Sequence, residues 1–404
     1  MFNPIRIVAL IYFKLKNTDP IPVKCGKNIV SGLYDSIHKA GYRSVFISCG
    51  GTIRRKGMLD ELIEKLGKNG IKTTVYSEIK SDPTVSQVEN GLKLLKENNC
   101  DCVIAAGGGS VLDCTKVIAL RASNPLIPVS LMSFYIRPLR RSLPLYMIPT
   151  TSGTGSEITY FSVITDEKKK MKRAVITDKY MPEEIIFDTE LLRHVPHDPT
   201  VYAGLDALTH TVESYISSYK SSFPEDAESA PKVVHDIFTY LPSAASDPDN
   251  EEAREKMAMA AYNAGINFRR ISVGYVHAIA HRLGETYHVP HGMACAAVMP
   301  HVLRHSMPQA KKDLDELAVK SGIAADAEDL IEKIEKLGRD LGIPSGFSEI
   351  KRSDYKLMIK RVISEAGLQG CPAKLNSEQV TQIFDDLASG KGVKNNDTGQ
   401  HQNT

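Results

Sequence analysis

An alternation of short apolar segments with helical patterns between residues 31 and 120 is the feature that most limits what this chain can fold into. The segments with the length and composition of strands are residues 44–48, 72–76 and 102–106, and those with helical spacing are residues 31–40, 59–66, 85–98 and 111–120. Strands separated by helices in this way imply a parallel sheet covered on both faces. We therefore expect an α/β, Rossmann-like domain that binds ligands at the carboxyl ends of its strands.

The pattern changes after the prolines of residues 196–199. Before them we expect further strands at residues 7–13, 145–148, 162–165 and 185–188. After them we expect only helices, at residues 203–217, 232–241, 251–268, 274–282, 312–320, 327–337, 355–365 and 377–388. The sequence thus predicts an α/β domain over residues 1–195 and an all-α domain over residues 196–390. Residues 391–404, rich in Asn, Gln, Gly and Lys, are expected to form a disordered tail.

Two loops rich in small residues follow predicted strands. The first is Gly107-Gly108-Gly109-Ser110, which leads directly into a helix, so that backbone N–H groups and the helix N-terminus can face a phosphate. Alone, such a turn needs no ligand. The second runs from Thr150 to Glu157 and offers hydroxyls and free amides again. Two loops at strand ends can hold the two ends of one dinucleotide, so we interpret residues 1–195 as dinucleotide-binding.

The turn after residues 44–48 bears on which nicotinamide is bound. A carboxylate at the end of the second strand normally binds the adenosine ribose 2′-hydroxyl and repels a 2′-phosphate. Here Gly50, Gly51 and Thr52 stand in its place, followed by the cations of residues 54–56. Free amides, a hydroxyl and cations suit a phosphate, which predicts NADP(H) over NAD(H). The alternative is that the cations only decorate the start of the next helix.

Histidines gather in the second half of the chain. His277, His281, His288 and His291 lie within sixteen residues, and His277 and His281 share one helix face because they are four apart. Upstream, Asp206 and His210 have the same spacing, and the apolar Leu205, Leu208 and Val212 face elsewhere on the same predicted helix. A site of imidazoles and one carboxylate suits Fe(II), Zn(II), Mn(II) or Co(II). The alternative is that backbone groups or water satisfy these histidines.

The histidine segment and the Asp206-Ala-Leu-Thr-His210 segment together resemble the signatures of the iron-containing (group III) alcohol dehydrogenases. The resemblance implies a dehydroquinate synthase-like fold and a metal held by Asp206, His210, His277 and His291. It also places His281 beside the nicotinamide, and assigns no ligand role to His288.

The glycine loops extend the resemblance. They stand here as GGGSVLDCTK and TTSGTGSE, and the turn at Gly50 is similar to the GGS-x-K-K turn of NADPH-dependent members. The implied cofactor contacts are Gly50, Gly51, Thr52, Gly108, Gly109, Ser110, Thr150, Thr151, Thr154 and Lys172. Phe161 and Phe268 stand at positions that line the family's substrate pocket, and family members commonly form dimers or larger assemblies.

The function implied is hydride transfer between a nicotinamide and a small alcohol or aldehyde. A divalent metal would polarise the carbonyl, and the resemblance implies that this metal is iron. His281 is the candidate for passing the alcohol proton to solvent, or else only packs beside the cofactor. Glycerol dehydrogenases and dehydroquinate synthases share the architecture, although their metal motifs differ. A non-enzymatic nucleotide-binding protein is a further alternative.

Composition excludes several partners. A formal charge of +2, with both signs mixed along the chain, predicts binding to neither nucleic acid nor membranes. Seven scattered cysteines form neither a disulfide framework nor a CxxC pattern, and no stretch has the length of a membrane span, so we expect a cytoplasmic protein.

Three arginines near the implied pocket, Arg269, Arg270 and Arg282, further suggest an aldehyde that carries an anionic group.

Overall fold

A computed structural model describes residues 13–14, 20–132, 138–169, 171–367 and 369–390. Six parallel strands form one sheet in the order β1-β8-β5-β4-β2-β3. Their bounds are β1 Val23–Gly26, β2 Ser44–Cys49, β3 Lys72–Tyr76, β4 Cys102–Gly107, β5 Leu145–Pro149 and β8 Glu184–Asp188. The Rossmann-like parallel sheet is thereby confirmed. A separate antiparallel hairpin joins β6 (Phe161–Asp166) to β7 (Met171–Ile176).

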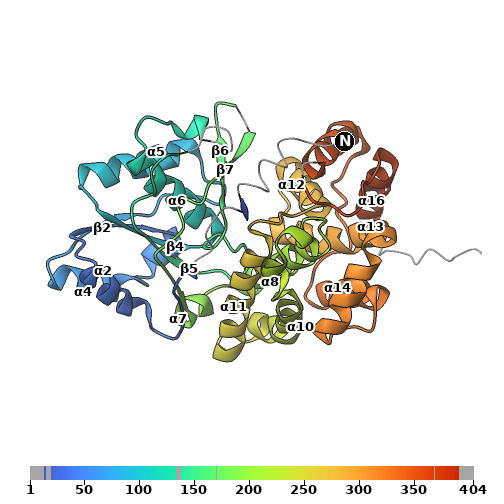
Figure 1. Ribbon diagram of the computed structural model, residues 1–404, viewed down its shortest axis with the longest axis horizontal. Coiled ribbons are helices and arrows are strands. Elements are labelled where there is room, and N and C mark those ends of the chain that lie inside the picture. The colour runs from blue at the N-terminus through green and yellow to red at the C-terminus, as the bar shows by residue number, and fades with distance from the viewer. Residues whose placement is uncertain (1–12, 15–19, 133–137, 170, 368, 391–404) are drawn as a thin grey trace, which may run out of the picture.

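Helices cover both faces of the sheet, as the alternation of apolar segments predicted (Figure 1). On one side lie α2 (Leu33–Lys39) and α4 (Asp60–Lys68), and on the other α5 (Val85–Glu97) and α6 (Gly109–Ser123). Along β2, Val45 and Ile47 pack into the first of these two cores and Phe46 into the second. Because successive side chains of a strand point to opposite faces, a strand between two helical layers is apolar throughout.

The second half of the chain is helical, and no strand follows β8 among the described residues. Its helices are α7 Thr189–Arg193, α8 His197–Tyr215, α9 Pro224–Ala227, α10 Ala230–Ser246, α11 Glu251–Phe268, α12 Tyr275–Tyr287, α13 His291–Ser321, α14 Ala327–Asp340, α15 Tyr355–Ala366 and α16 Ser377–Ser389. Figure 1 shows them beside the sheet, with α7, α8 and α11 on the side that faces it. Phe187 of β8 and Tyr262 of α11 join the two halves, with ring centroids 6.3 Å apart.

The structure differs from expectation in three respects. The strand expected at residues 7–13 lies outside the described residues except for Phe13, which is helical and stacks on Tyr160. Neither β1 nor β7 was predicted. The third difference is α13, which begins at His291 instead of residue 312 and contains Pro300 and Pro308. Each proline removes a backbone N–H, but burial of α13 against α8, α12 and α14 keeps the helix continuous.

Two further expectations concern the ends of the chain and membranes. The tail expected over residues 391–404 lies outside the described residues. Within the part of the chain that the structure describes, no helix combines the length and the apolar character needed to cross a bilayer.

Candidate metal centre and cofactor crevice

The predicted metal ligands come from three helices. Asp206 and His210 lie one turn apart on α8, and His277 lies on α12. His291 is the first residue of α13. The chain turns back sharply between α12 and α13, because His288 ends α12 with a left-handed φ of 58° and Pro290 caps α13. Local sequence therefore builds the turn that returns the chain to the cluster.

Close packing of helices completes the approach. A Cβ at position 292 would lie 2.1 Å from the carbonyl oxygen of Tyr202 on α8, so only glycine allows the start of α13 to lie this close. His291, next to Gly292, is thereby held against the helix that carries Asp206.

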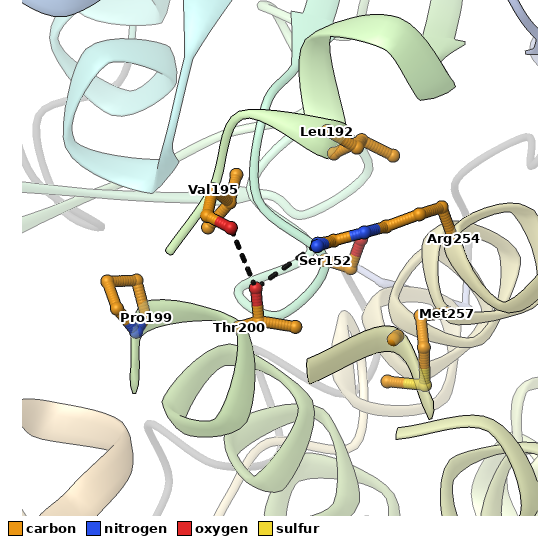
Figure 2. A pocket seen from close by; sticks show the side chains of 8 residues that line it. Ser152, Leu192, Val195, Pro199, Thr200, Arg254 and Met257 are labelled. Atoms are coloured by element: carbon orange, nitrogen blue, oxygen red, sulfur yellow. Dashed lines mark hydrogen bonds between the residues drawn. The ribbon is translucent and has the colours of Figure 1, made fainter. Parts of the chain in front are cut away.

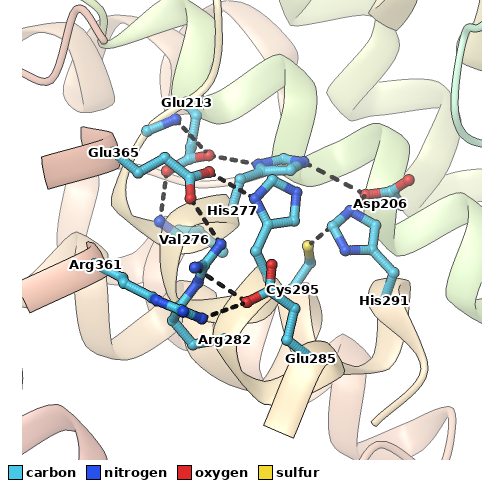
Figure 3. Close-up of polar contacts among 12 residues, drawn as sticks. Asp206, Glu213, Val276, His277, Arg282, Glu285, His291, Cys295, Arg361 and Glu365 are labelled. Carbon is cyan, nitrogen blue, oxygen red and sulfur yellow. Dashed lines mark hydrogen bonds and ion pairs between the residues drawn. The ribbon is translucent and has the colours of Figure 1, made fainter. Parts of the chain in front are cut away.

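Three imidazole nitrogens lie around one carboxylate oxygen of Asp206. Among the described residues, the ligand atoms that all lie within 4.8 Å of one another belong to Asp206, His277, His291 and Cys295, and His210 is not in that set. Asp206 Oδ1 lies 3.9 Å from the Nε2 atom of His210, 3.6 Å from that of His277 and 3.5 Å from that of His291. Ligands about 2.1 Å from a tetrahedral ion stand about 3.4 Å apart, so these separations suit one divalent cation. Figure 3 shows Asp206, His277 and His291 directed toward one another.

Buried atoms without partners support this interpretation. Asp206 Oδ1 and His277 Nε2 have no hydrogen-bond partner among the described residues, although both are buried. Such groups cost free energy unless something satisfies them, and a cation between them would do so. The residues therefore fit a divalent metal, with the half-exposed His291 on the open side of the cluster.

Glu213 of α8, which the sequence analysis missed, orients His277. Its carboxylate lies 2.6 Å from His277 Nδ1 and accepts backbone N–H groups of Gly274 at 2.9 Å and Val276 at 2.7 Å. With Nδ1 held in this way, Nε2 of His277 faces Asp206. A carboxylate behind a ligating histidine is a common means of fixing its tautomer.

The charges of the cluster leave room for one cation. Burial alone would lower the pKa of His277, but its interactions with the carboxylates of Asp206 and Glu213 raise it to about 9. Burial lowers the pKa of His210 to about 4. Burial of Asp206 would raise the pKa of its carboxyl, but His210 and His291 hold it well below the usual range. Positive charge from a proton on His277, or from a divalent ion in its place, is therefore favourable beside the two buried carboxylates.

Cys295 also belongs to the cluster, which the sequence analysis expected to lack a thiolate. It lies one turn after His291 on α13, and its Sγ is 3.7 Å from His291 Nε2. Burial raises the pKa of this thiol well above its usual value, which favours the neutral group as long as no metal lies beside it. The i,i+4 spacing from His291 was the signal that could have revealed it.

The two predicted substrate-pocket residues differ in position. Phe268, at the end of α11, stacks on the His210 ring with centroids 4.0 Å apart and thus borders the cluster. Phe161 begins β6, where its carbonyl oxygen accepts a hydrogen bond from Lys116 at 2.5 Å. No contact among the described residues joins Phe161 to the cluster.

The predicted cofactor loops lie together at the carboxyl ends of neighbouring strands. They follow β2, β4 and β5, which are neighbours, and the strands end in register: Cys49 pairs with Ala106, and Gly107 with Pro149. From β2 the chain first adds β3 on one side and then β4 on the other side. The position between β2 and β4 is therefore the topological switch point, where such sheets bind nucleotides.

Direct contacts join the two glycine loops. A Cβ at Gly109 would lie 2.8 Å from the Thr154 side chain, and one at Gly108 would lie 3.4 Å from that of Thr151. Thr150 donates its N–H to the Gly107 carbonyl at 3.0 Å. The two predicted loops therefore pack against each other and are not two separate turns.

The second loop is also tied to the helical half. A Cβ at Gly153 would lie 2.6 Å from the backbone of Ala203 on α8, the helix that carries the predicted ligands Asp206 and His210. Behind this loop a small cavity includes Ser152 and the buried Arg254 of α11 in its wall (Figure 2). The guanidinium Nη1 of Arg254 donates to Thr200 Oγ1 on α8 at 3.2 Å. These contacts couple the position of the loop to that of the metal helix.

At the end of β2, the predicted phosphate turn has one cation facing it. Gly50 precedes α3 (Gly51–Arg55) in an extended conformation. Arg55 folds back so that its Nη2 donates to Thr52 Oγ1 at 3.1 Å, whereas Arg54 points away to Asp60, 3.3 Å distant. Of the predicted cations, Arg55 is thus the one placed against the turn.

Lys172 and Ser110 both contact the segment before α5. Lys172 Nζ on β7 pairs with Asp82 at 2.8 Å, and Ser110 Oγ donates to the carbonyl of Ser81. Lys172 is therefore engaged by a carboxylate near the glycine turn.

Carboxylates already neutralise the three arginines that suggested an anionic substrate. Arg270 pairs with Asp226 and Glu225, Arg269 pairs with Asp226, and Arg282 pairs with Glu285 and Glu365. Their side chains are almost fully buried. They serve packing between helices, so the expectation that they bind an anion has no support in the structure.

Nucleotide-type turns at a sheet edge, next to a histidine–carboxylate cluster, are the combination that a metal-dependent nicotinamide dehydrogenase needs. The family model described as iron-containing alcohol dehydrogenase matches residues 20–189, and that of the Fe-containing alcohol dehydrogenase family, C-terminal, matches residues 200–388. The chain belongs to the iron-containing alcohol dehydrogenase family.

Individual relatives agree. Alcohol dehydrogenase 4 of Saccharomyces cerevisiae (strain YJM789) is 34% identical over 364 residues, which cover 89% of this chain and 94% of that protein. The structure of sulfoacetaldehyde reductase from Bifidobacterium kashiwanohense in complex with NAD+ matches 93% of this chain and 98% of its own, with a TM-score of 0.86 and 26% identity. That of a 1,3-propanediol oxidoreductase matches 91% and 98%, with a TM-score of 0.85 and 29% identity.

Proposed function

We propose that this protein is a metal-dependent alcohol dehydrogenase or aldehyde reductase that transfers a hydride between a nicotinamide and a small alcohol or aldehyde, with NADPH favoured. The observation that carries the proposal is the convergence of three imidazole Nε2 atoms on one buried carboxylate oxygen of Asp206. The relatives are alcohol and aldehyde oxidoreductases by name.

In this proposal Asp206, His210, His277 and His291 hold the metal, Fe(II) or alternatively Zn(II) or another divalent ion. Such an ion supplies Lewis acidity toward the substrate oxygen, and the nicotinamide supplies or takes the hydride. Glu213 keeps His277 in the tautomer whose Nε2 faces the cation, and Phe268 packs against His210 so that water is kept from that side.

His281 is the proposed proton relay. It lies one turn after His277 on α12, its ring stacks on that of His291 with centroids 5.3 Å apart, and 38% of its side chain is exposed. A residue that borders both the cluster and solvent can accept the hydroxyl proton of an alcohol and release it to water. In the reverse direction the His281 imidazole returns a proton to the developing alkoxide.

The preference for NADPH rests on the turn after β2. Gly50 leaves the position of a ribose-binding carboxylate without a side chain, and Arg55 and Thr52 stand beside it. A 2′-phosphate there would accept charge-assisted hydrogen bonds, each contributing about 1.5–3 kcal/mol. The proposal departs from the reductase of Bifidobacterium kashiwanohense, whose structure contains NAD+.

The remaining cofactor contacts that we propose are Gly51, Gly108, Gly109, Ser110, Thr150, Thr151, Thr154 and Lys172. Residues 1–195 would form the dinucleotide-binding domain and residues 196–390 the metal-binding domain. A homo-oligomer, such as a dimer, and a cytoplasmic location complete the proposal; the seven cysteines, all free thiols, are compatible with that location.

One experiment tests the reaction class. Purified protein is stripped of metal, reloaded with Fe(II) or Zn(II), and assayed with NADPH and NADH against a panel of aldehydes. We expect reduction that depends on added metal and is more efficient with NADPH. Equal turnover by the metal-free and metal-loaded protein would contradict the proposal.

A further inference from the structure

We infer that Glu365 is a positioning residue that holds His281 with its Nε2 directed to the reacting alcohol, and that Arg282 fixes Glu365 in that position. The inference deepens the proposed function, because it rests on His281 as the proton relay. It gives a task to two residues that lie outside the metal cluster and outside the cofactor loops.

The contact between Glu365 and His281 is short and specific. Glu365 Oε1, on α15, lies 2.6 Å from His281 Nδ1, on α12. These residues are 84 positions apart in the sequence, so packing of α15 against α12 is what brings them together. The other ring nitrogen, Nε2, has no hydrogen-bond partner in the described part of the chain.

This arrangement selects one tautomer of the neutral imidazole. A carboxylate can only accept, so Nδ1 carries the proton and donates it to Glu365, which leaves the lone pair on Nε2. When an alcohol is oxidised, its O–H bond breaks and that lone pair takes the proton, while the hydride leaves carbon for the oxidised nicotinamide. Without Glu365 both tautomers are open, and the imidazolium formed in this step has no carboxylate beside it.

Arg282 completes the arrangement from the other side. Its Nη2 donates to Glu365 Oε2 at 3.0 Å, and its Nη1 lies 3.1 Å from Glu285. The Arg282 side chain is only 12% exposed and that of Glu365 27%, so solvent screens this pair less than an open surface pair. Figure 3 shows Arg282 between Glu365 and Glu285, with Arg361 on the outer side.

Arg361 offers a matched control. It also lies on α15 and also takes part in the ion-pair network, but its one ion-pair partner among the described residues is Glu285, at 3.4 Å, and half of its side chain is exposed. Replacing Arg361 removes a charge from the same helix and leaves the contacts of Glu365 intact.

A merely structural reading gives Glu365 a different task, that of tying α15 to α12. The two readings separate in a double-mutant cycle, because a residue that acts through His281 has no effect once His281 is absent. We would measure kcat and KM for a primary alcohol, together with bound metal, in Glu365→Gln, Glu365→Asp, Arg361→Met and His281→Ala, and in the double variant of Glu365→Gln with His281→Ala.

We expect Glu365→Gln to lower kcat about ten- to hundredfold with KM and metal content unchanged, since it should remove part of the roughly 10²–10⁴-fold that a positioned acid–base group contributes. Glu365→Asp, which keeps the carboxylate, should recover part of the loss, and Arg361→Met should match the wild type. In the His281→Ala background, Glu365→Gln should change kcat less than about twofold. An equal loss in both backgrounds would overturn the inference in favour of a helix tie.

A second measurement does not depend on turnover. In protein labelled with 15N-histidine and loaded with Zn(II), the His281 resonances are assigned from their loss in His281→Ala. At alkaline pH we expect the Nδ1-protonated tautomer in the wild type and a mixture in Glu365→Gln. The same tautomer in both proteins would overturn the positioning role, whereas a wild-type enzyme inactive on every alcohol would contradict the proposed function and leave this result standing.

Discussion

The metal centre and the cofactor crevice are built by different means. At the proposed metal centre, side chains from three helices lie together, and Glu213 holds the orientation of His277. At the proposed cofactor site, backbone turns follow three strands, and Arg55, the side chain that we propose to bear on cofactor choice, is exposed. The centre is therefore expected to tolerate few substitutions, whereas the crevice is open to change in specificity.

The largest effect should follow from His277→Ala. Loss of this Nε2 removes one ligand and leaves Asp206 and Glu213 as buried carboxylates without a counter-charge. We expect metal content to fall to background and turnover to fall at least about a thousandfold, because a Lewis acid contributes several kcal/mol. Metal analysis and circular dichroism on the same sample check this.

Cys295→Ala is the matched control for that variant, since it changes a residue of the same cluster. Its neutral thiol is not expected to contribute to binding, so metal content and activity should stay close to the wild type. Loss of metal in Cys295→Ala would show that the ligand set differs from the one proposed.

A smaller effect is expected from Glu213→Gln, which keeps the shape of the side chain behind His277. Partners of this kind typically change metal affinity about ten- to hundredfold. We expect the dissociation constant for Zn(II) to rise on that scale, measured by competition with a chelator. If the affinity is unchanged, the orientation of His277 is held by packing and not by this carboxylate.

Gly50→Asp tests the openness of the crevice. A Cβ at this position meets only Ile53, at 3.8 Å, which is an ordinary van der Waals contact, so a side chain can begin there without a clash. It would accept from a ribose 2′-hydroxyl and repel a 2′-phosphate, and we expect the preference between NADPH and NADH to reverse by about tenfold or more.

Two arginine variants sharpen the same comparison. Arg55→Ala should weaken NADPH binding and leave NADH binding unchanged, whereas Arg54→Ala, whose side chain points to Asp60, should affect neither. Fluorescence titration measures both constants. Equal affinity of the unmodified protein for the two cofactors would refute this interpretation of the turn.

The smallest effect concerns substrate charge. Because carboxylates pair with Arg269, Arg270 and Arg282, none of them offers a free cation to a substrate. Neutral and anionic aldehydes of equal length should therefore not differ in KM through these residues, and Arg269→Gln should not shift the ratio of the two KM values. A marked preference for the anionic aldehyde that disappears in this variant would contradict the prediction.

The sequence by itself determined what depends on neighbours along the chain. The alternation of short apolar segments with helical segments predicted the parallel sheet. The i,i+4 spacing paired Asp206 with His210 and predicted that His277 and His281 share a helix face. Glycines after strands marked the turns of the crevice. These features are local because the geometry of a helix or strand relates residues a few positions apart.

Only the tertiary structure decided which distant side chains support the site. Glu213 lies 64 residues from His277, and Glu365 lies 84 residues from His281, so no local spacing could indicate either pair. The same holds for the arginines, whose charge suggested a ligand until packing brought carboxylates to them. Helix packing depends on the fit of whole surfaces, and for this reason the partners of a buried charge follow from the fold and not from its neighbours in the chain.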